Sequence, residues 1–349
     1  MNFADRINHK VHLSYKDILL VPYDDSFCKV LSRNDPDISS EICPGQQIDI
    51  PIVSSPMDSI TGADMAVALS RNGAIGIHTR YIGLNPEADY LCMCEAVQEM
   101  VKQRVQYPAI AVGVKHLSLI ENLLEYGAKI ICIDIANGNH ILVKEILEPV
   151  ATLKNRFNFR IIAGNVASAK SAMRLVNAGA DTVKVGIGPG AACTTRRVTG
   201  FGVPQFSAIL EIASIFRNAG IQDKAKIIAD GGVRSSGDVV KALWAGADTV
   251  MGGYLFAGCN ECPSIEGKKQ YRGMASRTVS GRSDVAPEGV CMDVKTRGPV
   301  SDVIQQYAAS IKAACSMGGA LTLEQLRQNV RAIRVSTMSN EESDPVIIS

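Results

Sequence analysis

One pattern, which decides the fold, recurs four times: RNGAIGIH at residues 71–78, EYGAKIICID at 125–134, NAGADTVKVG at 177–186 and WAGADTVMGG at 244–253. In each copy the end of a helical segment is followed by a glycine and then by an apolar run. Glycine readily adopts the left-handed conformation that ends a helix, and a continuous apolar run is typical of a strand buried on both faces. The repeated unit is therefore a helix, a glycine and a buried strand.

Four more apolar runs complete a set of eight candidate strands: PIVSS at 51–55, PAIAVGV at 108–114, FRIIAGN at 159–165 and AKIIADG at 225–231. Helical patterns lie between them, for example at 63–72, 117–126, 167–178 and 236–245. Strands that alternate with helices predict a parallel sheet, and eight units favour a closed (β/α)8 TIM barrel. A doubly wound open sheet is the alternative, but its phosphate loop would follow the first strand, where SSPMD stands instead.

Length and charge limit the organisation and the partners. The 349 residues suit a single catalytic barrel domain with insertions, since such barrels need about 250 residues. Lys and Arg number 36 against 35 Asp and Glu, so no net positive field attracts nucleic acid or an anionic membrane. Any anionic ligand must therefore be held by local groups.

The ten cysteines are expected to be reduced thiols in a cytoplasmic protein. The start of the sequence does not read as a signal peptide, and no apolar run reaches the roughly 18 residues of a membrane span. Cys92 with Cys94, and Cys259 with Cys262, have the spacing of metal ligands, but neither has a well-spaced second pair. We therefore expect no structural zinc and no disulfide framework.

Three segments fall outside the alternating pattern. Residues 1–50 lead into the barrel, and 259–298, rich in Gly, Ser, Arg and Pro, follow the eighth strand. Long irregular segments in compact domains are often functional lids, and this one starts at a C-terminal strand end, so we predict a lid. Residues 337–349 form a C-terminal tail that is expected to be mobile or to pack on a neighbouring subunit.

The loop IGPGAACTTRRVTGFG after the sixth strand is the strongest candidate for chemistry. Barrel enzymes carry their active sites at this end of the strands. Cys193 stands on the loop close to Arg196 and Arg197, whose charge favours the nucleophilic thiolate. A buried cysteine in a glycine-rich turn is the plain structural alternative.

Two later loops indicate a phosphate site. Asp230-Gly231-Gly232 ends the seventh strand and Gly252-Gly253 ends the eighth, the usual phosphate positions in barrels, with a helix expected to begin near Ser235. Backbone N–H groups at a helix N-terminus bind a dianion without lysine. Each loop alone could be a simple turn, but both together favour a ligand.

These motifs resemble the IMP dehydrogenase/GMP reductase family. The resemblance runs from about residue 13 to 335 and rests on KDILLVP (16–22), SSPMD (54–58), AGNV (163–166), KVGIGPGAACTTRRVTGFGVPQ (184–205), IADGGVRSSGDV (228–239) and YRGMAS (271–276). CTTR after GPG is its most specific part. Three positions depart from the pattern. Thr79 stands where the reductase branch has a lysine, which argues against that branch, and Ala191 and Tyr254 stand where the family typically has a serine and a serine or glycine.

The resemblance implies a set of site residues. The catalytic group would be Cys193, Thr195 and Glu288, with Cys193 bonding to purine C2. Potassium would be held in the loop that carries Gly188, Gly190, Cys193 and Arg196, chiefly by backbone carbonyls. The nucleotide would be bound through its phosphate, ribose and base by Ser55, Met57, Asp230, Gly231, Gly232, Gly252, Gly253, Tyr271, Gly273, Met274, Ala275 and Gly289. The family also implies a homotetramer.

Within the family, the sequence favours a GMP reductase. The stretch RTVSGRSDVAPEGV at 277–290 is short for a dehydrogenase flap and lacks an Arg-Tyr pair, and 81–107 leaves no room for a regulatory tandem insert. DIANGN at 134–139 is similar to the reductase segment that touches the nicotinamide cofactor. NADPH would therefore meet Arg80 and Asp134, Ile135, Ala136, Asn137 and Gly138.

The expected reaction is reductive deamination of GMP to IMP, with a Thr195–Glu288 relay protonating the departing ammonia. KDILLVP, SSPMD and GVPQ look more like dehydrogenases, so oxidation of IMP to XMP with NAD is the first alternative. A nucleotide-binding barrel without activity and a flavin-dependent barrel oxidoreductase are the others.

Overall fold

The structure is a computed structural model that describes residues 8–81, 86–114, 117–276, 286, 288–336 and 339. Eight parallel strands close into a barrel, in the order β10-β11-β4-β5-β6-β7-β8-β9. This confirms the predicted TIM barrel. The barrel strands are β4 (Ile52–Ser54), β5 (Ile75–His78), β6 (Ala109–Val112), β7 (Ile130–Asp134), β8 (Arg160–Val166), β9 (Thr182–Val185), β10 (Lys226–Asp230) and β11 (Thr249–Gly252).

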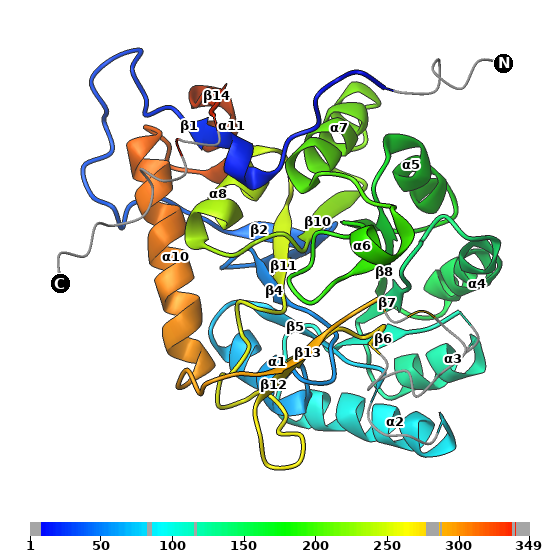
Figure 1. The fold of residues 1–349 in the computed structure, drawn as a ribbon. Helices are drawn as coiled ribbons and strands as arrows, with labels where there is room; N and C mark the ends of the chain where they lie inside the picture. The colour runs from blue at the N-terminus through cyan, green and yellow to red at the C-terminus, as the bar shows by residue number, and fades with distance from the viewer. Residues whose placement is uncertain are drawn as a thin grey trace, which may run out of the picture.

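Helices surround the barrel and return the chain from the end of one strand to the start of the next (Figure 1). The predicted helices are present with ends that differ by at most two residues. The outer helices are α1 (Ala63–Arg71), α2 (Pro86–Lys102), α3 (Leu117–Glu125), α4 (Ile141–Thr152), α5 (Ala169–Asn177), α7 (Gln205–Asn218), α8 (Ser236–Trp244) and α10 (Val300–Met317). The short α6 (Thr195–Thr199) follows β9, and α11 (Leu323–Asn329) precedes the last strand.

The repeated glycine has the backbone conformation that the sequence pattern predicts. Gly73, Gly127, Gly179 and Gly246 have φ angles of +75°, +102°, +111° and +108°. A Cβ atom at Gly179 would come within 2.5 Å of the Ala151 side chain, so glycine also allows close packing there. Both constraints favour glycine at this point of the repeat.

In two of the four copies of the repeat, an aspartate after Gly-Ala joins neighbouring strands. Asp181 accepts a 2.7 Å hydrogen bond from the backbone N–H of Ile161, and Asp248 accepts one of the same length from that of Ile227. The GAD motif thus supplies both the turn and a strand-to-strand contact at the N-terminal end of the barrel.

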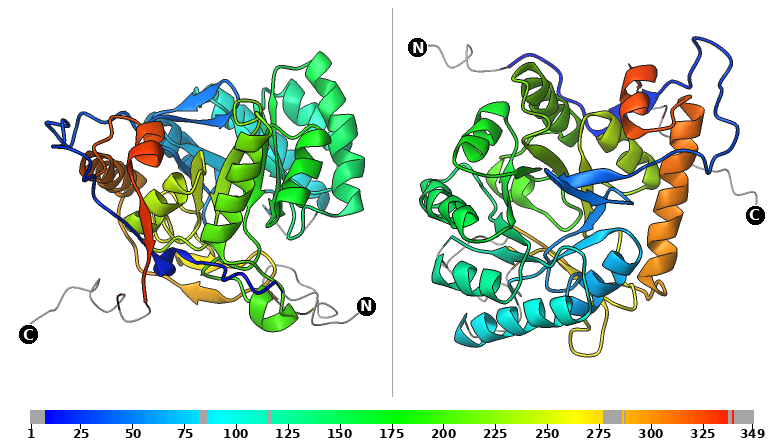
Figure 2. Two further views of the ribbon diagram at one scale, coloured as in Figure 1. Left: turned by 90° about the horizontal axis from the view of Figure 1, so that it is seen from above. Right: turned by 180° about the vertical axis from the view of Figure 1, so that it is seen from behind.

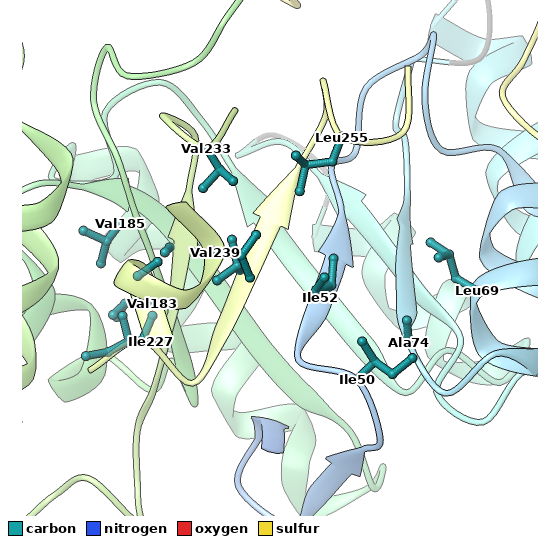
Figure 3. Close-up of a cluster of buried hydrophobic side chains, with 14 of the residues drawn as sticks. Ile50, Ile52, Leu69, Ala74, Val183, Val185, Ile227, Val233, Val239 and Leu255 are labelled. Atoms are coloured by element: carbon teal, nitrogen blue, oxygen red, sulfur yellow. The ribbon is translucent and has the colours of Figure 1, made fainter. Parts of the chain in front are cut away.

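Side chains of the strands alternate between two apolar clusters. On β10, Ile228 belongs to the inner cluster, whereas Ile227 points to the outer cluster against the helices, near Val183 and Val239 (Figure 3). The inner cluster is completed by a hairpin of β2 (Ser40–Cys43) and β3 (Gln46–Ile48), which contributes Ile42. The segment before β4 therefore does more than lead into the barrel, because this hairpin closes the N-terminal end of the barrel.

The opposite end carries the segment after β11. Within it, β12 (Gln270–Arg272) pairs antiparallel with β13 (Cys291–Asp293), on the other side of the barrel from the β2–β3 hairpin (Figure 2). Part of the predicted lid, residues 277–285 and 287, lies outside the described residues, as does the predicted tail except for residue 339. At the ends of the chain, β1 (Ile18–Leu20) pairs antiparallel with β14 (Ala332–Arg334).

Among the described helices, none combines the length and the apolar character that crossing a bilayer requires. All ten cysteines belong to the described part of the chain and are free thiols.

Candidate active site

A cavity of about 510 Å³ lies at the C-terminal ends of the barrel strands. Its walls come from the loops after the strands and from the segment around β12 and β13. It is lined by most of the predicted site residues: Ser55, Met57, Arg80, Asp134, Ile135, Ala136, Gly188, Gly190, Cys193, Thr195, Asp230, Gly231, Gly232, Gly252, Gly253, Tyr271, Gly273, Met274, Ala275 and Glu288. Residues far apart in sequence thus share one cavity, while Asn137, Gly138, Arg196 and Gly289 lie next to it in the chain.

Cys193, Thr195 and Glu288 form a chain of hydrogen bonds. The half-buried Cys193 thiol donates to Thr195 Oγ1 at 3.2 Å, and this hydroxyl donates to Glu288 Oε2 at 2.6 Å. A proton can therefore pass from sulfur to carboxylate through a hydroxyl, without water. Such a chain can produce a thiolate at Cys193 and an acid at Glu288 in one event.

Backbone contacts hold Glu288 beside the cysteine loop. Thr194 N–H donates to the Glu288 carbonyl, and Val290 N–H donates to the Ala192 carbonyl, both at 3.0 Å. Cys193 and Gly289 form the antiparallel bridge between them. The position of the carboxylate is therefore set by backbone pairing between two loops about 95 residues apart, which the sequence alone does not reveal.

Tyr271 connects the loops at the predicted phosphate end. Burial raises the pKa of Tyr271 well above its ordinary value, and Asp230 adds to this, whereas hydrogen bonds from the backbone N–H groups of Ala192 and Tyr254 lower it. Its hydroxyl therefore lies close to the cysteine loop and to the loop after β11. The Tyr254 ring packs edge-on against it at 5.7 Å between centroids. The departure at Tyr254 therefore adds an aromatic wall to this end of the cavity.

A buried lysine in the cavity wall was missed by the sequence analysis. Lys184 Nζ lies 2.7 Å from Asp134 Oδ1 and 2.9 Å from Asp230 Oδ2, and Asn165 Nδ2 donates to the same Asp230 oxygen at 2.8 Å. Burial lowers the pKa of Lys184, but the two carboxylates outweigh this and raise it above its ordinary value. A lysine inside the apolar strand DTVKV is the available signal, since a fully buried lysine is almost always paired.

The predicted cofactor residues divide into two groups. Arg80, Asp134, Ile135 and Ala136 line the cavity, and the Arg80 guanidinium lies 4.7 Å from the centre of the Tyr81 ring. In the second group, Asn137 Oδ1 accepts from the N–H of Asn139, and Gly138 N–H donates to the Asn165 carbonyl. The first group can meet a cofactor directly, and the second shapes the loop behind it.

The residues predicted to hold potassium lie on one tight loop. Cys193 N–H donates to the Gly190 carbonyl at 3.0 Å, and Gly188 has a φ angle of +84° with Arg196 packed against it. The Arg196 guanidinium donates to the Val203 carbonyl at 2.6 Å, which fixes the far side of the loop. Backbone carbonyls are ligands that a hard cation accepts, and the predicted potassium residues share this one short loop. Side-chain clusters of three or more His, Cys, Asp or Glu are absent from the described residues.

The fold and the cavity together define a (β/α)8 barrel with a thiol, carboxylates and glycine loops at its C-terminal face, where barrel enzymes carry out their chemistry. The sequence profile of the IMP dehydrogenase/GMP reductase domain matches residues 12–346. The chain belongs to the IMP dehydrogenase/GMP reductase family of purine nucleotide oxidoreductases, as its motifs indicate.

Relatives from both branches are similar to this chain. An inosine-5′-monophosphate dehydrogenase from Borreliella burgdorferi is 30% identical, covering 96% of this chain and 97% of that protein. One from Nitrosopumilus maritimus is also 30% identical, over 477 aligned positions that cover 96% of this chain and 98% of that protein. A crystal structure of a Trypanosoma brucei GMP reductase in complex with guanosine 5′-monophosphate has a TM-score of 0.84 and 26% identity, with 100% of both chains covered.

Proposed function

We propose that the protein is a GMP reductase, which converts GMP, NADPH and two protons into IMP, NADP⁺ and ammonium. The observation that carries this proposal is the hydrogen-bond chain from Cys193 through Thr195 to Glu288. It provides a nucleophile and an acid that share one proton, and loss of ammonia from C2 of guanine requires both.

The residues act in sequence on the bound nucleotide. Cys193 loses its proton through Thr195 to Glu288, and the thiolate bonds to C2 of the purine. Glu288 then returns the proton through the Thr195 hydroxyl to the amine on C2, which leaves as ammonia. The cofactor supplies a hydride to C2 when it is bound beside Arg80 and Asp134. Cleavage of the carbon–sulfur bond then releases IMP and restores the thiolate.

The other groups of the cavity bind and orient the substrate. The Gly231-Gly232 and Gly252-Gly253 backbones, with Tyr271, are the proposed phosphate site, and Asp230 is the proposed acceptor for the ribose hydroxyls. Carbonyls of the Gly188–Cys193 loop are the proposed potassium ligands. The cation would stabilise the loop that presents the thiol, since carbonyl dipoles pointing at one ion hold the backbone in place.

We further propose that the chain is one catalytic domain without a tandem regulatory insert, and that it assembles as a homotetramer. The alignment with the Nitrosopumilus maritimus relative runs over 477 positions, more than the 349 residues of this chain, which supports the absence of an internal insert here. The likeness of the whole chain to a GMP reductase structure supports the reductase branch.

IMP dehydrogenase is the second candidate, favoured by the names of the curated relatives. An absorbance assay at 340 nm, the nicotinamide band, separates the two: purified protein receives GMP with NADPH, or IMP with NAD⁺. We expect consumption of NADPH in the first mixture and no NADH in the second. Formation of NADH and XMP from IMP would overturn the reductase proposal, and activity in neither mixture would favour a binding protein without catalysis.

A further inference from the structure

Lys184 is a fully enclosed charge in the wall of the cavity. It stands on β9, its side chain is 2% exposed, and its Nζ contacts one oxygen of Asp134 and one of Asp230. The two aspartates belong to different strands, β7 and β10, on either side of β8 and β9. One ammonium group therefore joins the proposed cofactor side of the cavity to the proposed nucleotide side.

The ammonium acts as a fixed cation and not as a proton carrier. The two carboxylates raise the pKa of Lys184 above its ordinary value in spite of its burial, so the group stays charged over the physiological range. A buried ammonium is stable only when it is paired and hydrogen-bonded. Both aspartates are accordingly held at short distance, and neither can rotate freely.

Each aspartate retains one oxygen for a ligand. Oδ1 of Asp134 pairs with the Lys184 ammonium, and Oδ2 of Asp230 accepts hydrogen bonds from Lys184 and from Asn165. Among the described residues, no hydrogen bond involves the other oxygen of either carboxylate, although both side chains are about one-fifth exposed and line the cavity. When one oxygen of a carboxylate is fixed by a hydrogen bond, the other oxygen can accept a hydrogen bond from a ligand only in a defined direction.

We propose that Lys184 is a positioning residue that orients Asp230 toward the ribose hydroxyls of the nucleotide and Asp134 toward the cofactor. This inference rests on the proposed function for the identity of the ligand. It does not depend on the branch, because IMP is a product of the reductase and a substrate of the dehydrogenase.

The chain offers a matched control in Lys226. This lysine starts the neighbouring strand β10, its side chain is 9% exposed, and its Nζ lies 2.8 Å from Glu41 Oε2. It sits at the end of the strand opposite Asp230 and does not line the cavity. Glu41 is 36% exposed, so loss of Lys226 breaks a partly buried ion pair of a strand lysine without touching the proposed ribose acceptor.

The test measures recognition of the ribose hydroxyl by titration calorimetry with IMP and 2′-deoxy-IMP, in the absence of cofactor. Wild-type protein should bind IMP about tenfold more tightly, as expected for a hydrogen bond to a charged group. In Lys184→Met this ratio should fall below about threefold, because Asp230 loses its charged partner and is held by Asn165 alone. Lys184→Gln removes the charge and keeps a neutral donor for one carboxylate, and should also lower the ratio.

Two further variants separate positioning from general stability. Lys184→Arg keeps the charge and two donors, and should restore at least half of the tenfold ratio. Lys226→Met should lower the melting temperature but keep the ratio unchanged.

Retention of tenfold discrimination in both Lys184→Met and Lys184→Gln would overturn the positioning role and leave the proposed function intact. Failure of wild-type protein to bind either nucleotide would overturn both. An equal loss of discrimination in Lys226→Met would show that loss of any ion pair of the barrel strands has this effect, and would also contradict the proposal.

Discussion

At the scale of single residues, the Thr195 hydroxyl is the only link between sulfur and carboxylate in the hydrogen-bond chain of the described site. Thr195→Val replaces this hydroxyl with a methyl group of similar size, so the chain breaks while the packing is kept. We expect kcat to fall by about 10²- to 10³-fold, as for loss of a general acid–base group, with IMP affinity within about threefold of wild type. Glu288→Gln should have the same effect, measured by NADPH consumption and by titration calorimetry.

A hydroxyl one helical turn further on provides the control. Thr199 Oγ1 donates to the Thr195 carbonyl at 2.8 Å and takes no part in the chain. Thr199→Val should leave kcat within about twofold of wild type. If Glu288→Gln lost nucleotide affinity as strongly as turnover, Glu288 would be a base-binding carboxylate and its role as an acid would be disproved.

Single residues were predictable from sequence where a local motif carries them. Cys193 lies on the glycine-containing loop after β9, and Asp230 precedes Gly231 at the end of β10, a pattern that marks the ligand-binding face of a barrel. Lys184 has no such motif, because its partners lie on strands before and after its own and only the closed barrel brings them together. Long-range pairing of this kind leaves no periodic signal in the chain.

At the scale of elements, Gly273 and Gly289 decide how closely two parts of the segment after β11 approach each other beside the cysteine loop. A Cβ atom on Gly289 would lie 3.0 Å from the Cα of Gly273 and 3.2 Å from the backbone nitrogen of Ser276. These are backbone atoms, so the segment itself must move to accommodate a methyl group. We expect Gly289→Ala to shift Glu288 away from Thr195 and to reduce kcat by about tenfold or more, since small displacements of catalytic groups are costly.

The neighbouring residue tests whether the effect is specific. Val290 is 41% exposed, and its backbone N–H donates to the Ala192 carbonyl while its carbonyl accepts from Gly273 N–H. Val290→Ala keeps both backbone contacts and should retain activity close to wild type in the same assay. Wild-type kcat in Gly289→Ala would mean that the pairing of the two loops does not position Glu288.

Helices and strands were predictable from sequence where their apolar residues and glycines follow a regular pattern. The eight barrel strands and their helices follow from the repeated glycine and from apolar runs. The β2–β3 hairpin did not, because its strands are only four and three residues long and its apolar side chains pack against the barrel interior instead of a helix. The β12–β13 pair was likewise hidden, because all three residues of β13 are exposed and carry no apolar alternation.

At the scale of the whole molecule, the cavity joins loops from many strands, so a bound nucleotide should stabilise the entire barrel. A ligand present at about 100 times its dissociation constant adds about 2.7 kcal/mol to the free energy of unfolding. For a chain of 349 residues, with an unfolding entropy of about 2.1 cal/mol/K per residue, this raises Tm by about 4 °C. Differential scanning fluorimetry with IMP should detect this rise.

Two controls show what the rise depends on. The Cys193→Ser variant should show the same rise with IMP, because binding does not need the sulfur. Uridine 5′-monophosphate should give a smaller rise in Tm, because it lacks the purine. Equal shifts with the two nucleotides would show that only phosphate and ribose are recognised, and would contradict a purine-specific site.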